Sequence, residues 1–206
     1  MSIEIRPATA FEDVVTLVGP KKPTSNGCYC LADRISAKEN NGLHGPDRAA
    51  RVRELCAQDP SPGVIAYLHG EPVGWAAVHP RADTNFARSR VIPHVDALDV
   101  WSLWCFRVKP GHRKQGIMHT LIEGAVAYAR DCGAPAIEGY PLDNRGEKVN
   151  LTMAYVGTRN LFESAGFTKA ADTGSKIDGF PRILMRKSLM QTGNEPPASV
   201  DRAQCL

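Results

Sequence analysis

A short basic loop that ends in a glycine is the stretch of this sequence best suited to chemistry. Arg113, Lys114 and Gln115 stand directly before Gly116, and a segment with an apolar face follows. Two cations attract an anion, and glycine lets a bulky group approach the backbone. If a helix begins after Gly116, the unpaired N–H groups of its first turn and its dipole strengthen that attraction. These residues predict a phosphate or diphosphate site, and the alternative is an ordinary turn with a solvated basic loop.

The elements on either side of the loop would hold it in place. Residues 100–108 are rich in β-branched and aromatic side chains, which favours a strand, and Pro110 and Gly111 end that strand. After Gly116, apolar residues recur at helical spacing on one face, namely Ile117, Leu121, Ala125 and Tyr128. The sequence therefore predicts a strand, a phosphate-binding loop and a helix in succession.

Two common phosphate motifs do not explain the loop. Gly111 and Gly116 have the glycine spacing of a Walker A loop, but Ile117 and Met118 stand where Lys and Ser/Thr belong. The dinucleotide pattern G-x-G-x-x-G is absent from this stretch. Residues 113–118 instead resemble motif A of the GCN5-related N-acetyltransferases, R/Q-x-x-G-x-G/A, with Met118 in place of the usual small residue.

The resemblance extends over residues 2–187. The segment Leu-Phe-Glu-Ser-Ala-Gly-Phe that ends at Phe167 is similar to the family's L-Y-x-x-x-G-F, and the expected order of elements, β-α-α-β-β-β-α-β-α-β-β, agrees as well. The resemblance implies an α/β fold (α+β with a mixed sheet), in which flanking helices cover a central sheet of about seven parallel and antiparallel strands. We expect one acetyltransferase domain over residues 1–187 and a disordered tail over 188–206, which are rich in polar residues, Gly and Pro.

Local patterns predict the remaining elements. We expect three helices whose N-caps are Thr9, Asp47 and Thr158. Residues 19–46 are expected to form a long loop with one helical turn. The expected strands are residues 3–6, 64–68, 73–78, 136–141, 167–171 and 182–187.

The resemblance also implies a cosubstrate, acetyl-CoA, and the residues that would bind it. Backbone N–H groups around Phe106, Arg107 and Val108 would polarise the thioester carbonyl, and the pantetheine arm would lie where the strand at 136–141 parts from the central one. The diphosphate would be held by the loop and the first helical residues, which are Arg113, Lys114, Gln115, Gly116, Ile117 and Met118.

Acetyl transfer also requires a route for protons, because an alkylamine has a pKa of about 10 and must lose a proton. Glu138 is our candidate base, with a surface salt bridge as its alternative role, and His79, Asp99 and Asp143 are weaker candidates. Phe162 stands where the family has a tyrosine acid, so we assign that role to Tyr155. The alternatives are that Tyr155 only packs the loop, or that the thiolate leaves without an acid.

These features together predict an N-acetyltransferase that moves an acetyl group from acetyl-CoA directly to a primary amine of a small molecule or peptide, within a ternary complex. A CoA-binding regulatory module with little or no turnover is the alternative, because Phe162 cannot donate a proton.

Composition narrows the partners and the compartment. A net charge of +3 is too small to indicate nucleic-acid binding, and no apolar stretch approaches the roughly 18–20 residues that span a bilayer. Six cysteines without a signal peptide favour a reduced, cytoplasmic protein. Cys28 and Cys30 have only His44 as a further ligand nearby, so we expect no metal site; they either pack the loop onto the core or line the acceptor pocket. The sequence leaves a homodimer open.

Overall fold

A computed structural model describes residues 3–22, 24–150 and 153–190 of the chain. Within these residues seven strands form one sheet in the order β1-β2-β3-β4-β5-β7-β6. Neighbouring strands are antiparallel except β4 and β5, which are parallel. The predicted mixed sheet is therefore confirmed. The strands are β1 (Ile3–Pro7), β2 (Gly63–Leu68), β3 (Glu71–Pro80), β4 (Trp101–Val108), β5 (Ala136–Gly139), β6 (Thr168–Ile177) and β7 (Phe180–Ser188).

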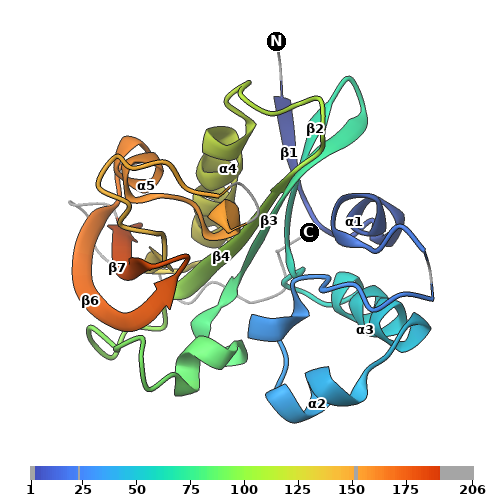
Figure 1. The fold of residues 1–206 in the computed structure, drawn as a ribbon, viewed down its shortest axis with the longest axis horizontal. Helices are drawn as coiled ribbons and strands as arrows, with labels where there is room; N and C mark the ends of the chain where they lie inside the picture. The colour runs from blue at the N-terminus through green and yellow to red at the C-terminus, as the bar shows by residue number, and fades with distance from the viewer. Residues whose placement is uncertain (1–2, 23, 151–152, 191–206) are drawn as a thin grey trace.

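Helices cover both faces of this sheet (Figure 1). The α-helices are α1 (Phe11–Val18), α2 (Ala37–Gly42), α3 (Pro46–Cys56), α4 (Ile117–Asp131) and α5 (Arg159–Ser164). Short 3-10 helices are η1 (Leu31–Asp33), η2 (Arg81–Asp83), η3 (Asn85–Arg88) and η4 (Ala154–Val156). In Figure 1, α4 and α5 lie on one side of the sheet, and α1 and α3 lie on the other.

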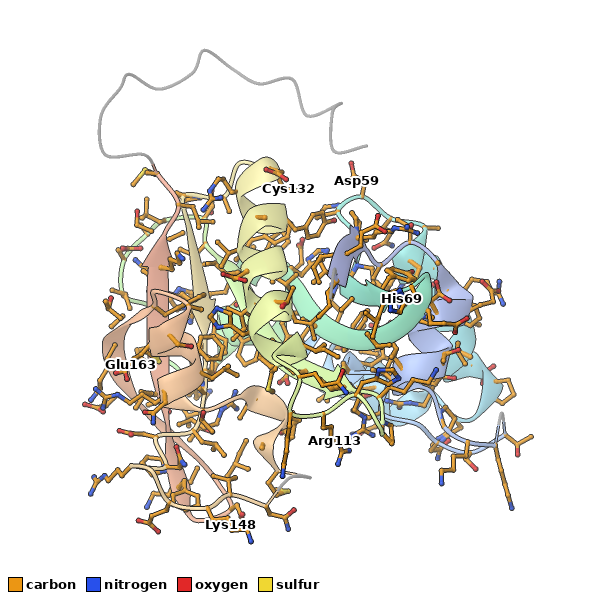
Figure 2. All side chains as sticks on the ribbon, turned by 90° about the horizontal axis from the view of Figure 1, so that it is seen from above. Asp59, His69, Arg113, Cys132, Lys148 and Glu163 are labelled. Atoms are coloured by element: carbon orange, nitrogen blue, oxygen red, sulfur yellow. The ribbon has the colours of Figure 1, made fainter. Side chains whose placement is uncertain are left out.

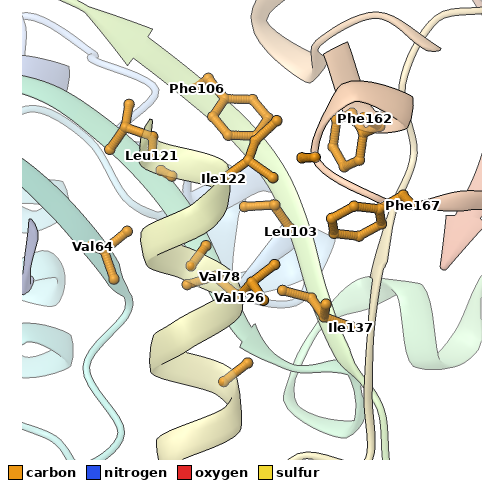
Figure 3. Close-up of a cluster of buried hydrophobic side chains, with 14 of the residues drawn as sticks. Val64, Val78, Leu103, Phe106, Leu121, Ile122, Val126, Ile137, Phe162 and Phe167 are labelled. Atoms are coloured by element: carbon orange, nitrogen blue, oxygen red, sulfur yellow. The ribbon is translucent and has the colours of Figure 1, made fainter. Parts of the chain in front are cut away.

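The longest helix, α4, packs over β1 to β4 and encloses the larger apolar cluster, which we call the α4 core. Figure 3 shows Leu121, Ile122 and Val126 of α4 facing β-strand residues such as Leu103. Gly124 allows this close approach, because a Cβ at that position would lie 2.5 Å from Ile5 of β1. The helix whose N-terminus forms part of the predicted phosphate site is thus fixed to the centre of the sheet.

A second apolar cluster, the α1–α3 core, fills the opposite face. Trp75 and Trp104 of the sheet meet Leu17 of α1, Val52 of α3 and Leu31 of η1 there. Burying such large side chains stabilises the fold by roughly 1.5–3 kcal/mol each. The long segment between α1 and α3 is therefore held on the sheet by its own apolar residues.

Several local expectations were wrong. Ala10, not Thr9, is the N-cap of α1, and Gly45, not Asp47, is the N-cap of α3. Where one helical turn was expected within the loop at 19–46, the chain forms two short helices, η1 and α2, and the N-cap Ser36 of α2 accepts a hydrogen bond from the Glu39 N–H at 3.1 Å. Strand β6 continues to Ile177, six residues past its expected end.

The packed part of the chain extends slightly beyond the expected boundary at residue 187. Ser188 ends β7, and Leu189 is buried in the α4 core. Residues 191–206 of the expected tail lie outside the described residues.

Candidate active site

Strands β4 and β5 part beside the centre of the sheet. They pair from Trp101 with Ile137 to Leu103 with Gly139, and β5 ends there while β4 continues to Val108. On its other side β4 carries a bulge, because Ala77 pairs with Cys105 whereas Val78 pairs with Leu103, which leaves Trp104 as an extra residue. The last five residues of β4 therefore present a backbone edge that β5 does not cover.

The three predicted thioester-binding residues lie in this uncovered segment. Phe106 is buried in the α4 core, Arg107 is exposed, and Val108 is half-buried at the end of the strand. The side chain of Phe106 therefore serves packing, and what this residue can offer a ligand at the parted edge is its backbone.

The basic loop follows at the same end of β4 and leads into α4. Its course requires a left-handed backbone at Lys114 (φ 62°) and at Gly116 (φ 78°), which is the N-cap of α4. A Cβ at Gly116 would meet no atom within 4 Å, so the helix N-terminus is open to a ligand. Arg113 and Lys114 are exposed, and Figure 2 shows Arg113 at this end of α4, with Cys132 at the other.

The other predicted loop residues brace this turn. The side-chain amide of Gln115 donates to the Gly111 carbonyl at 3.3 Å. Ile117 is buried under β3, where its Cγ2 would lie 2.8 Å from a Cβ at Gly74, and Met118 packs against the α4 core. Ile117 and Met118 can therefore offer a ligand their backbone N–H groups only.

Glu138 occupies a buried ion-pair network, which disfavours the predicted role as base. Its side chain is fully buried, and its two oxygens accept hydrogen bonds from Arg81 at 2.7 Å and from Arg186 at 2.6 Å. Arg186 also pairs with Asp96. With both oxygens bound by guanidinium groups, the carboxylate joins β5 to η2 and β7 and does not face a substrate.

Phe162, at the position of the family's tyrosine, belongs to the α4 core. Its ring is fully buried and makes edge-to-face contacts with Phe106 and Phe167, at centroid distances of 6.1 and 5.0 Å (Figure 3). The ring also lies against Gly139, where an added Cβ would come within 2.0 Å of it. This position faces β5 and cannot deliver a proton to a ligand.

Tyr155, the predicted acid, lies on η4, which packs beside β4. Its side chain is half-buried, and burial raises the pKa of the phenol above its ordinary value. Arg182, Asp33, Cys105 and Cys28 also act on this phenol through their charges, so Tyr155 lies near η1 and the middle of β4. The hydroxyl remains protonated at neutral pH, as a proton donor must be.

Two polar residues near Tyr155 were missed by sequence reasoning. Asp33 of η1 makes no hydrogen bond or close ion pair with any described residue, and burial raises the pKa of its carboxyl. Arg182 of β7 donates from Nε to the Tyr140 carbonyl at 2.9 Å, while its buried Nη2 has no hydrogen-bond partner in the described part of the chain. No motif marks either residue, because η1 and β7 are distant in the sequence and only the fold brings them together.

A polar cleft of about 460 Å³ opens at the far end of β3. Its lining includes Arg34, Asp59, His79, Asp83 and Arg88. Burial, assisted by the charge of Arg34, lowers the pKa of His79 to about 4, so its imidazole is neutral at pH 7. The other weaker base candidates are less suited, because Asp99 is exposed on a loop and Asp143 pairs with Arg159 at 3.3 Å.

Among the described residues, no helix has the length and apolar character to cross a bilayer. The same part of the chain contains no group of three or more metal-ligating side chains.

Comparisons with known proteins agree with this geometry. A model of the acetyltransferase (GNAT) family matches residues 32–144, which is more than half of the chain. No curated protein sequence matches the chain significantly.

Solved structures share the fold at low sequence identity. A GNAT-family acetyltransferase from Streptococcus pneumoniae has a TM-score of 0.52 and 17% identity, with 91% of this chain and 99% of that chain covered. Ard1 from Thermoplasma volcanium has a TM-score of 0.53 and 12% identity, with 93% and 100% covered. A chain of the NatC complex bound to Gag peptide and CoA has a TM-score of 0.53 and 15% identity, with 92% and 100% covered. With the parted strands, the open helix N-terminus and the family match taken together, the chain belongs to the acetyltransferase (GNAT) family.

Proposed function

We propose that this protein transfers an acetyl group from acetyl-CoA directly to a primary amine of a small molecule or peptide. The observation that carries the proposal is the uncovered edge of β4 beyond Leu103, which leads into a loop with an open helix N-terminus. A ligand that carries both a thioester and a diphosphate requires these two features close together, as they are at this end of β4. The similar chain of the NatC complex, described with CoA and a peptide, supports the same assignment.

In this proposal each end of acetyl-CoA has its own binding residues. The diphosphate lies over the N–H groups from Gly116 to Met118, with Arg113 and Lys114 as cations. The thioester carbonyl accepts a hydrogen bond from the uncovered backbone between Phe106 and Val108.

The acceptor amine would approach from the face that carries the α1–α3 core, where Asp33 and Tyr155 lie. The neutral amine attacks the thioester carbon, and the resulting oxyanion is stabilised by the N–H groups of β4. Asp33 takes the proton that the nitrogen loses, replacing Glu138 as our proposed base, because its carboxylate makes no hydrogen bond or close ion pair with a described residue and burial raises its pKa. Tyr155 gives its proton to the departing CoA thiolate and regains one from solvent.

A binding module without turnover is the second candidate function, and the burial of Phe162 is the observation that favours it. The two candidates share acetyl-CoA binding and differ in chemistry. Release of free CoA thiol in the presence of a panel of amines supports the transferase, whereas tight binding without thiol release on that panel supports the module.

The proposed binding site is tested by calorimetric titration with acetyl-CoA, ATP and NAD. We expect acetyl-CoA alone to bind to the wild-type chain, and we expect Gly116→Glu to abolish binding because its carboxylate meets the diphosphate. Gly133→Glu is the matched control, since Gly133 has the same positive φ and equally open surroundings at the other end of α4. Equal binding of ATP, or equal loss in both variants, would contradict the assignment.

A further inference from the structure

Two cysteines from distant parts of the chain meet beside the uncovered edge of β4. The Sγ atom of Cys30, just before η1, lies 2.6 Å from the Sγ atom of Cys105 on β4. A disulfide bond measures about 2.05 Å, so the two sulfur atoms are within a small side-chain rotation of bonding distance. We propose that Cys30 and Cys105 form a redox-sensitive disulfide that fastens residues 24–36 over the acceptor face of β4.

The backbone before η1 directs Cys30 toward β4. Tyr29 and Cys30 both have a left-handed conformation, with φ of 49° and 55°, which non-glycine residues adopt at a cost of about 1 kcal/mol or more each. Arg48 of α3 holds this conformation, because its guanidinium donates to the carbonyl oxygens of Gly27 at 2.7 Å and Cys28 at 3.3 Å. The sulfur contact is therefore part of a braced turn.

The surroundings of Cys30 favour slow formation of the disulfide. Its hydrogen bond with Cys105, together with burial, raises the pKa of Cys30, while the charge of Arg107 acts in the opposite direction. A protonated thiol is a poor nucleophile, so the two reduced thiols react slowly with an oxidant. Cys30 and Cys105 are each partly exposed, which gives a small oxidant or thiol access to the pair.

The bond can form and break with a balanced exchange of electrons. One thiolate attacks the O–O bond of a peroxide, becomes a sulfenic acid and releases water. The second thiolate then attacks the sulfenic sulfur and releases a second water, so two thiols and one peroxide yield a disulfide and two waters. A dithiol reductant reverses the change by thiol–disulfide exchange.

Formation of the disulfide would affect the proposed active site, because Cys105 directly precedes Phe106, where the proposed thioester-binding segment begins. A covalent link there would keep η1 and Asp33 against the strand that the acceptor amine must reach. This consequence rests on the proposed function, whereas the bond itself does not.

The bond is tested on the full chain equilibrated in glutathione buffers, alkylated with iodoacetamide and digested with trypsin. We expect oxidising buffers to link the peptide 22–34, which carries Cys30, to the peptide 91–107, which carries Cys105. The link should persist in Cys28→Ser and vanish in Cys30→Ser. Alkylation of both cysteines at every buffer ratio, or a link that survives in Cys30→Ser, overturns the proposal.

Fastening is tested by hydrogen exchange at the amides of Leu31, Arg34 and Ile35, which bond to carbonyl groups within the same turn. We expect oxidation to slow their exchange in the wild-type chain, dithiothreitol to restore it, and Cys30→Ser to show no change. Unaltered exchange in the linked wild-type chain overturns the fastening. Neither measurement depends on acetyl transfer, so a failure here is distinct from a failure of the proposed function.

Discussion

At the scale of single residues, the proposed role of Tyr155 as the acid, in place of the buried Phe162, gives the most direct test of mechanism. Tyr155→Phe removes the proposed proton donor while keeping the ring, so we expect kcat to fall by about 10²–10⁴-fold with little change in the KM for acetyl-CoA. Steady-state release of free thiol measures both constants. We expect Phe162→Tyr to give no rate gain, because the ring that would carry the hydroxyl is fully buried in the core. A Tyr155→Phe variant with wild-type kcat would contradict the assignment.

Glu138 offers a second prediction at this scale. Glu138→Gln keeps the shape of the side chain but leaves Arg81 and Arg186 without their shared charge, so we expect a loss of roughly 3 kcal/mol in the free energy of unfolding. Urea denaturation measures this loss. Glu163→Gln is the control, because its pair with Arg159 is exposed and should contribute little. Unchanged stability combined with a large fall in kcat would restore Glu138 as the base.

At the scale of elements, the close packing of α4 against β1 can be tested by two glycine substitutions. Gly→Ala inside a helix ordinarily stabilises it by about 0.5–1 kcal/mol. We expect a gain at or below the lower end of this range for Gly42→Ala, because Gly42 is the last residue of α2 and a Cβ there meets nothing within 4 Å. We expect Gly124→Ala to lose about 1–3 kcal/mol instead, because its Cβ would lie 2.5 Å from Ile5. The midpoints of urea unfolding of the two variants and the wild-type chain measure these changes, and a raised midpoint for Gly124→Ala would contradict the packing described.

The elements that local sequence patterns could predict are those with strong periodicity or turn residues. The apolar face of α4 and the hairpin of β2 and β3 have such patterns, and both formed where expected. Helix α2 has no buried residue and therefore no apolar periodicity, so the one helical turn expected within residues 19–46 could not be assigned to residues 37–42. The phosphate loop could be located because glycine and basic residues stand together in the sequence.

The rest of the site depends on contacts that no local pattern records. Glu138 is an ordinary strand carboxylate in the sequence, and only the folded chain brings Arg81 and Arg186 to its two oxygens. Asp33 and the contact between Cys30 and Cys105 depend in the same way on how one loop packs over β4.

At the scale of the whole molecule, His79 makes stability depend on pH. Its pKa is about 4 in the folded protein and 6.5 in the unfolded chain, so between these values the unfolded chain binds more protons. The free energy of unfolding should therefore fall as pH drops from 6.5 to 4, by roughly 3 kcal/mol from this residue. We expect His79→Gln to flatten this part of the profile in urea denaturation at stepped pH. Equal slopes in both proteins would contradict the assigned pKa.

The division of the molecule into two faces has a consequence for how such a protein diverges. Helix α4 and the basic loop lie on one side of the sheet, whereas residues 24–60 supply most of the cover on the other. Mutations in that cover can accumulate while the proposed acetyl-CoA site remains intact, so one ancestral site can serve descendants with different acceptor preferences. An exchange of residues 24–60 between two such descendants should carry the preference with it and leave the affinity for acetyl-CoA unchanged.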